Sequence, residues 1–240
     1  LLMLSGIGPK QHLHEFGLKV VQDLRVGYNF QDHFTFFGSF FTYTTTTTEP
    51  PRSMQESLFD YLENREGTLS NPSLNLMMYY DSTEKTPLYP DLHILFFNLQ
   101  RSQVEQFLNA VKTKPEVVND FIASIKSDYV LLPFISSLRP GILGRVYLKS
   151  ANPFASVGID LNYPEDSELL KRRMQVVLAG IKFLNSLNQT KSLRSKKIVY
   201  EKAYVKGCQD SWECTIPNLS KTYDHHVGTS KMGPRDDPQT

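Results

Sequence analysis

Strand-forming and helix-forming segments do not alternate regularly along this chain, and their order restricts the folds that it can adopt. Aromatic and aliphatic runs predict strands at residues 34–43, 74–80 and 92–99. Apolar residues at helical spacing predict two helices within 103–127, and after further strands a long helix is expected at 164–187. Because a doubly wound parallel sheet needs a helix between successive strands, we expect an α+β fold with a mostly antiparallel sheet and helices packed on one face.

The charge balance argues against a nucleic-acid partner. The chain has 26 Lys and Arg residues against 25 Asp and Glu residues, a formal net charge of +1, and its basic residues are dispersed. No apolar run reaches the length of about 20 residues that a membrane-spanning helix needs. We therefore expect neither a nucleic-acid partner nor a membrane span.

The two ends of the chain are abrupt. Leu1 opens an apolar, helix-like run without an initiator Met or a signal peptide, and a charged turn ends the chain at Thr240. An apolar helix that begins at the first residue is typical of the interior of a longer sequence. We therefore expect the chain to be a fragment of a longer protein.

The two cysteines, Cys208 and Cys214, lie six positions apart in CQDSWEC. A metal site would need more ligands, and no histidine lies in this loop. The residues leave a local disulfide and two buried free thiols equally open. A disulfide, together with the glycosylation sequons at Asn188 and Asn218, would suit a protein outside the cell. An extracellular location is therefore expected.

The histidine doublet His225–His226 in YDHHVGTSKMGP is a candidate for chemistry. In an extended backbone the two rings point to opposite faces, so they are poor ligands for one metal ion, and we expect no metal site. A partly desolvated imidazole titrates near neutral pH and can act as a general base. A purely structural role for both rings is the competing interpretation.

Four segments resemble those of the glucose–methanol–choline (GMC) flavoprotein oxidoreductases and occur in that family's order. They are LLMLSGIGP, VGYNFQDH, LRPGILGRVYLKSANPFASVGIDLNY and YDHHVGTSKMGP. The resemblance covers nearly the whole chain, and the CQDSWEC loop is similar to the insect glucose dehydrogenase-like branch. The family's GxGxxG loop and its terminal segment with a second catalytic His or Asn have no counterpart in this sequence.

The resemblance implies an FAD-dependent oxidoreductase that acts on the CH–OH group of an alcohol or sugar, with quinone or oxygen as electron acceptor. His225 matches the family's active-site histidine, which implies a general base beside the flavin that takes the hydroxyl proton while hydride passes to flavin N5. Asn29, His33 and Gly228 match positions near the cofactor. For Asn29 and His33 a structural role in a turn is the alternative.

The resemblance also implies a domain order. Residues 1–33 would belong to a Rossmann-like FAD domain, residues 34–204 to the substrate-binding domain, and residues 205–240 would return to the FAD domain. This sequence departs from the family at His226, where proline is usual, and at Asp224, where tyrosine is common. A truncated, non-catalytic paralogue that binds a ligand or a partner is the alternative function.

Overall fold

The computed structural model describes residues 1–44, 53–67, 69–70, 74–83, 89–139, 141, 143–162, 168–234 and 236–237. The chain divides into two compact units, which we call the terminal unit and the sheet unit. The terminal unit comprises Leu1–Phe34, Arg139–Arg173 and Thr222–Thr240, and the sheet unit comprises Thr35–Leu138 and Met174–Lys221.

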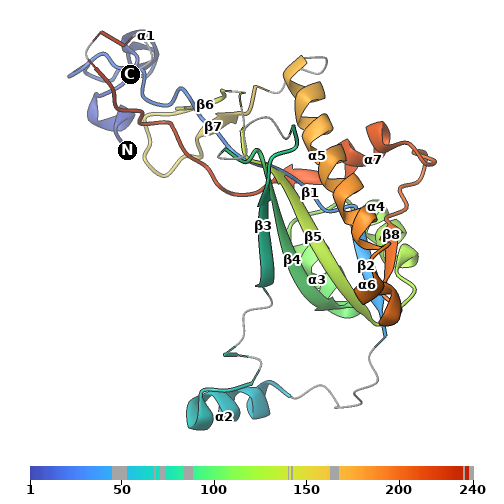
Figure 1. Cartoon of the computed structure of the whole chain (residues 1–240). Coiled ribbons are helices and arrows are strands. Elements are labelled where there is room, and N and C mark those ends of the chain that lie inside the picture. The colour runs from blue at the N-terminus through green and yellow to red at the C-terminus, as the bar shows by residue number, and fades with distance from the viewer. Residues whose placement is uncertain are drawn as a thin grey trace. The chain divides into compact units, whose positions relative to one another are not determined.

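The sheet unit is built on one sheet, which contains seven strands in the described part of the chain. The strands are β1 (Phe34–Phe36), β2 (Ser39–Tyr43), β3 (Leu74–Tyr80), β4 (Leu92–Gln100), β5 (Tyr129–Ser137), β8 (Val199–Lys202) and β9 (Ser220–Thr222). Their order is β3-β4-β5-β1-β9, and β2 pairs with β5 and β8. The pairings among β2, β3, β4, β5 and β8 are antiparallel. Figure 1 shows β3, β4 and β5 running side by side.

Two helices of the sheet unit cover one face of the sheet through aromatic contacts. The helices of the sheet unit are α2 (Met54–Asn64), α3 (Arg101–Ala110), α4 (Pro115–Ser124), α6 (Lys191–Ser195), α7 (Trp212–Asn218) and most of α5 (Glu168–Leu187). Phe134 of β5 packs against Phe107 of α3, and Phe40 of β2 packs against Phe121 of α4, each with ring centroids 5.2 Å apart. Phe40, Phe121 and Phe134 are buried and Phe107 is partly buried, so α3 and α4 close this side of the sheet.

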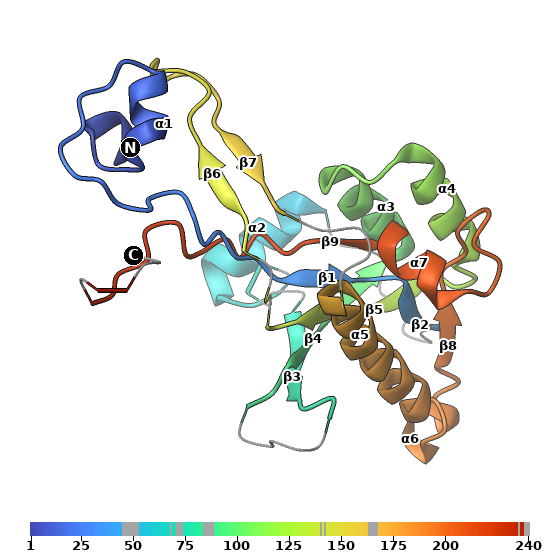
Figure 2. The ribbon, with the colours of Figure 1, turned by 90° about the horizontal axis from the view of Figure 1, so that it is seen from above.

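The opposite face is covered by α5. A Cβ added to Gly180 would lie 2.7 Å from the side chain of Ile135 and 3.1 Å from that of Leu92, so the helix backbone lies directly on the sheet. Figure 2 shows α5 on one side of the strands and α3 with α4 on the other. The α+β class with a mostly antiparallel sheet is confirmed. The helices cover both faces rather than one, because apolar side chains project from both faces and each set must be buried.

The terminal unit is assembled from distant parts of the sequence. Its elements are the 3-10 helix η1 (Met3–Ser5), α1 (Lys10–Glu15), and the strands β6 (Arg145–Tyr147) and β7 (Gly158–Asp160), which pair antiparallel. A small apolar core forms where Met3, Leu13 and Leu148 are buried together. Isolated antiparallel bridges join Phe30 to Gly144 and Gln31 to Val227. The backbone near residue 30 therefore lies between two later segments of the chain.

The elements of the structure match several of the segments expected from the sequence. The strands expected at 74–80 and 92–99 and the two helices within 103–127 are confirmed. Cys208 and Cys214 form a disulfide, which decides the choice that the sequence left open. The first residues of the expected long helix, 164–167, lie outside the described residues. No helix in the described part of the chain is long and apolar enough to cross a membrane.

The boundaries of the two compact units differ from the boundaries of the expected domains. Residues 139–173 belong to the same unit as both ends of the chain, and residues 205–221 belong to the sheet unit. The assignment of 34–204 to a substrate-binding domain, and of the flanking residues to an FAD domain, stays a prediction.

Candidate active site

Two segments of the terminal unit, residues 29–33 and 222–229, lie side by side as a short antiparallel ladder. Gln31 N donates to Val227 O at 2.9 Å, and Val227 N donates back to Gln31 O at 3.0 Å. Tyr223 N donates to His33 O at 3.1 Å. This ladder brings His33 next to His225, although 192 positions separate them in the sequence.

Asn29 and Gly228 contact each other within this ladder. Both have positive φ angles, 60° and 98°. Asn29 Nδ2 donates to Gly228 O at 3.2 Å, and Asn29 Oδ1 accepts from Gln31 Nε2 at 3.0 Å. A Cβ added to Gly228 would lie 2.2 Å from Asn29 O. The glycine is therefore required by the close approach of Asn29, while cofactor binding by either residue stays a prediction.

Asp32 is the residue of this site that sequence reasoning missed. Its side chain is buried, and Oδ1 accepts from the backbone N–H of His33 at 2.8 Å and from that of His225 at 3.0 Å. Oδ2 accepts from the hydroxyl of Thr222 and lies 3.4 Å from Nε2 of His226. One carboxylate thus fixes both segments. The feature of the sequence that could have identified Asp32 is its position directly before His33 in VGYNFQDH.

The imidazole rings of His33 and His225 meet through like nitrogen atoms. Their Nδ1 atoms lie 3.1 Å apart, and the rings make a T-shaped contact with centroids 5.2 Å apart. The ring of Tyr223 packs on His225 with a centroid distance of 4.3 Å. His225 is exposed, and no residue in the described ranges hydrogen-bonds to its Nε2. His225 therefore has one anchored nitrogen and one open nitrogen, the arrangement that a general base needs.

His226 takes different partners from its neighbour. Its Nε2 lies 3.2 Å from Thr222 Oγ1 and 3.9 Å from a carboxylate oxygen of Asp224, in addition to its contact with Asp32. Asp224 has a φ angle of 56° and donates its backbone N–H to Thr222 Oγ1 at 3.2 Å, so it forms the turn before the doublet. The two adjacent rings thus have different partners: His225 contacts His33, and His226 contacts Asp32 and Thr222.

Comparisons with known proteins agree on one family. The family model described as GMC oxidoreductase matches residues 140–240. Glucose dehydrogenase (FAD, quinone) from Drosophila melanogaster is 28% identical over 252 residues, which cover 99% of this chain and 37% of that protein. Alcohol dehydrogenase (acceptor) from Pseudomonas putida is 29% identical over 249 residues, covering 97% of this chain and 39% of the relative. The chain thus spans well under half the length of these relatives.

Solved structures show the same fold. Formate oxidase superposes with a TM-score of 0.70 at 21% identity, covering 95% of this chain and 42% of that one. Pyridoxine 4-oxidase superposes with a TM-score of 0.62 at 16% identity, covering 99% of this chain and 40% of that one. At these identities the likeness establishes the fold alone.

Proposed function

We propose that the protein carrying this chain is a GMC-type, FAD-dependent oxidoreductase acting on the CH–OH group of a small alcohol or sugar. The observation that carries the proposal is His225, whose Nδ1 is anchored while Nε2 is open. Two relatives are named glucose dehydrogenase (FAD, quinone) and alcohol dehydrogenase (acceptor), which supports a CH–OH donor and a quinone as electron acceptor. Oxygen is the alternative acceptor.

The chemistry divides between the chain and its cofactor. Oxidation of a CH–OH group removes a proton from the oxygen and a hydride from the carbon, and a C=O bond forms. No side chain can accept the hydride, so the FAD supplies the hydride acceptor when it is bound. His225 supplies the base, because an imidazole with a lone pair on Nε2 can take the hydroxyl proton at neutral pH.

The exposed residues around His225 fit a flat, largely apolar ring system. Val227 is 61% exposed and Met232 is 93% exposed, so apolar surface lies in the same segment as the imidazole. Covering that surface with the isoalloxazine ring would be favourable. Asn29 instead uses its amide within the protein, on Gly228 and Gln31. We therefore assign Asn29 and Gly228 the task of shaping the loop that presents His225.

The test is flavin reduction in the intact protein that carries this chain. His225→Ala should slow anaerobic reduction by the alcohol substrate roughly 10²- to 10⁴-fold, while FAD stays bound. His14→Ala, an exposed histidine on α1 of the same unit, is the matched control and should reduce at the wild-type rate. A wild-type protein that binds FAD but is not reduced by any of a panel of alcohols and sugars would favour the non-catalytic alternative.

An extracellular location is a second part of the proposal. The Cys208–Cys214 disulfide supports it, because structural disulfides form in oxidising compartments. The sequons at Asn188 and Asn218 are accessory support. Expression in insect cells tests it: the protein should accumulate in the medium and shift in mass on treatment with an N-glycosidase. Retention in the cytosol without glycan would contradict it.

A further inference from the structure

The His33–His225 contact restricts where the protons of the two rings can be. Their Nδ1 atoms are 3.1 Å apart, which is a hydrogen-bond distance. A neutral imidazole carries a single ring proton, so one Nδ1 must donate and the other must accept. Two protonated Nδ1 atoms would place two donors against each other, and two bare ones would place two lone pairs together. The contact therefore holds one proton between the rings.

Only one of the two arrangements makes His225 a base. If His225 Nδ1–H donates to His33, then His225 Nε2 carries a lone pair and can accept the substrate proton. If His33 donates instead, the single proton of His225 sits on Nε2, and that atom has no lone pair to offer. A histidine side chain free in water favours the proton on Nε2, so a partner at Nδ1 is needed to favour the useful tautomer.

The backbone fixes the distance between the two rings. Asp32 Oδ1 accepts from the backbone N–H of both His33 and His225, at 2.8 and 3.0 Å. His33 O accepts from Tyr223 N at 3.1 Å, and the Tyr223 ring packs on His225. Both histidines are thus attached to one buried carboxylate, and the ring of His225 is held from its side. His33 is placed by this framework to act on His225 Nδ1.

We propose that His33 is a positioning residue, which holds His225 as the tautomer with its proton on Nδ1 and its lone pair on Nε2. This inference rests on the proposed role of His225 and names the group that orients that base. Once His225 has taken the hydroxyl proton its ring is a cation, and the hydrogen bond from Nδ1–H to His33 becomes charge-assisted and stronger. The interaction is therefore largest when the proton moves, so its loss lowers kcat more than it raises KM.

The direct test is the tautomer of His225, measured by long-range ¹H–¹⁵N NMR on the intact protein with ¹⁵N-labelled histidine. The His225 signals are assigned by their loss in His225→Ala. Wild type should show the Nδ1–H tautomer, and His33→Phe, which keeps a ring but has no acceptor, should shift His225 toward Nε2–H. His33→Asn offers a carbonyl oxygen as the acceptor and should retain more of the Nδ1–H form than His33→Phe.

Flavin reduction gives the second readout. His33→Phe should lower kcat by up to the roughly 10²- to 10⁴-fold that a general base contributes, with KM changed much less, because the lost interaction is strongest in the transition state. His33→Asn should recover part of kcat. His14→Phe serves as the control for a histidine-to-phenylalanine change in the same unit.

The outcomes separate this inference from the proposed function. Wild-type His225 in the Nε2–H form would overturn the positioning role, and this measurement needs no variant that might fail to fold. An unchanged tautomer and an unchanged kcat in His33→Phe would overturn it too, while slow reduction in His225→Ala would leave the proposed function standing. Wild-type reduction in His225→Ala would instead overturn the proposed function itself.

Discussion

The buried carboxylate of Asp32 accepts a hydrogen bond from the backbone N–H of His225 at 3.0 Å. The same oxygen accepts from the backbone N–H of His33 at 2.8 Å, so the two imidazoles that meet at the candidate site share one anchor. A carboxylate that receives several donors at once is difficult to replace, because each donor left without a partner in a buried place is costly.

Replacement of Asp32 should therefore be destabilising in a way that depends on the acceptor. Asp32→Ala leaves the N–H groups of His33 and His225 without their acceptor and should lower the free energy of unfolding by about 2–4 kcal/mol. Asp32→Asn keeps an acceptor oxygen and should lose less. Denaturant unfolding of the intact protein measures both. Asp224→Asn is the control, since Asp224 is exposed and asparagine tolerates its positive φ. Equal losses of unfolding free energy in Asp32→Ala and Asp224→Asn would contradict the anchoring role.

Gly228→Ala should displace the loop that carries His225. The added Cβ would lie 2.2 Å from Asn29 O, and the φ angle of 98° is unfavourable for alanine. The clash and the backbone strain together should lower stability by roughly 2–4 kcal/mol and slow flavin reduction. Gly17→Ala is the matched control, because Gly17 also has a positive φ, 67°, but no atom within 4 Å of the added Cβ. A loss in Gly228→Ala no greater than that in Gly17→Ala would show that the close approach to Asn29 does not matter.

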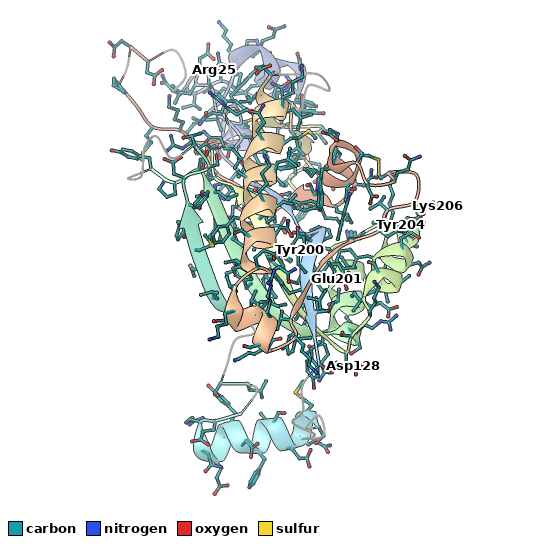
Figure 3. The ribbon with its side chains drawn as sticks, turned by 45° about the vertical axis from the view of Figure 1, so that its right-hand side comes forward. Arg25, Asp128, Tyr200, Glu201, Tyr204 and Lys206 are labelled. Atoms are coloured by element: carbon teal, nitrogen blue, oxygen red, sulfur yellow. A yellow bond between two sulfur atoms is a disulfide. The ribbon has the colours of Figure 1, made fainter. Side chains whose placement is uncertain are left out.

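Tyr200 should make the sheet unit sensitive to alkaline pH. Tyr200, which Figure 3 labels, lies on β8. Burial raises the pKa of Tyr200 from 10.0 to about 12, and the Ser39 hydroxyl offsets only part of that shift. Above pH 10 the unfolded chain releases a proton that the folded protein keeps. Stability from this group is therefore fully present below pH 10 and is lost as the pH rises toward 12, by up to about 1.4 kcal/mol per pH unit.

Tyr200→Phe checks that prediction, because it removes the titrating hydroxyl and keeps the ring. At neutral pH the variant should be within about 1 kcal/mol of wild type, and its stability should fall less steeply between pH 10 and 12. Tyr204→Phe, at a half-exposed tyrosine of the same unit, is the control. Parallel pH curves for wild type and Tyr200→Phe would show that the Tyr200 proton is not coupled to folding.

The Cys208–Cys214 disulfide should contribute a local, moderate stabilisation. It closes a short loop with a sequence separation of 6. Loop-closure entropy for such a ring amounts to roughly 2 kcal/mol. The Cys208→Ser, Cys214→Ser double variant should therefore lose about that much and still fold, with the effect confined to α7 and its neighbours in hydrogen exchange. Loss of the whole fold, or no change in exchange at α7, would contradict this estimate.

The strand and helix order could be predicted because it depends on local patterns. Aromatic runs predicted β2 and β4, and the helical spacing of apolar residues predicted α4, since each pattern reports how one segment buries its own side chains. The use of both sheet faces was missed, because apolar residues on both faces of a strand do not reveal which helix covers which side. The close fit at Gly180 depends on tertiary packing.

The candidate site was predictable only in part, and for a related reason. His225 and Gly228 were identified through the resemblance of their segment to a family. Asp32 was missed, because an acidic residue in a polar turn is usually exposed, and its burial results from pairing with residues 222–229 far along the chain. The His33–His225 contact is equally non-local. Because the site is formed by two segments that are far apart in the sequence, neither segment alone contains a motif that reveals it.

Anaerobic flavin reduction by substrate in His225→Ala, with and without added imidazole, is the most direct measurement of whether His225 is the base. We expect reduction to slow roughly 10²- to 10⁴-fold with FAD still bound, and imidazole in solution to restore part of the rate by occupying the place of the missing ring. Reduction at the wild-type rate without imidazole would contradict the assignment of His225.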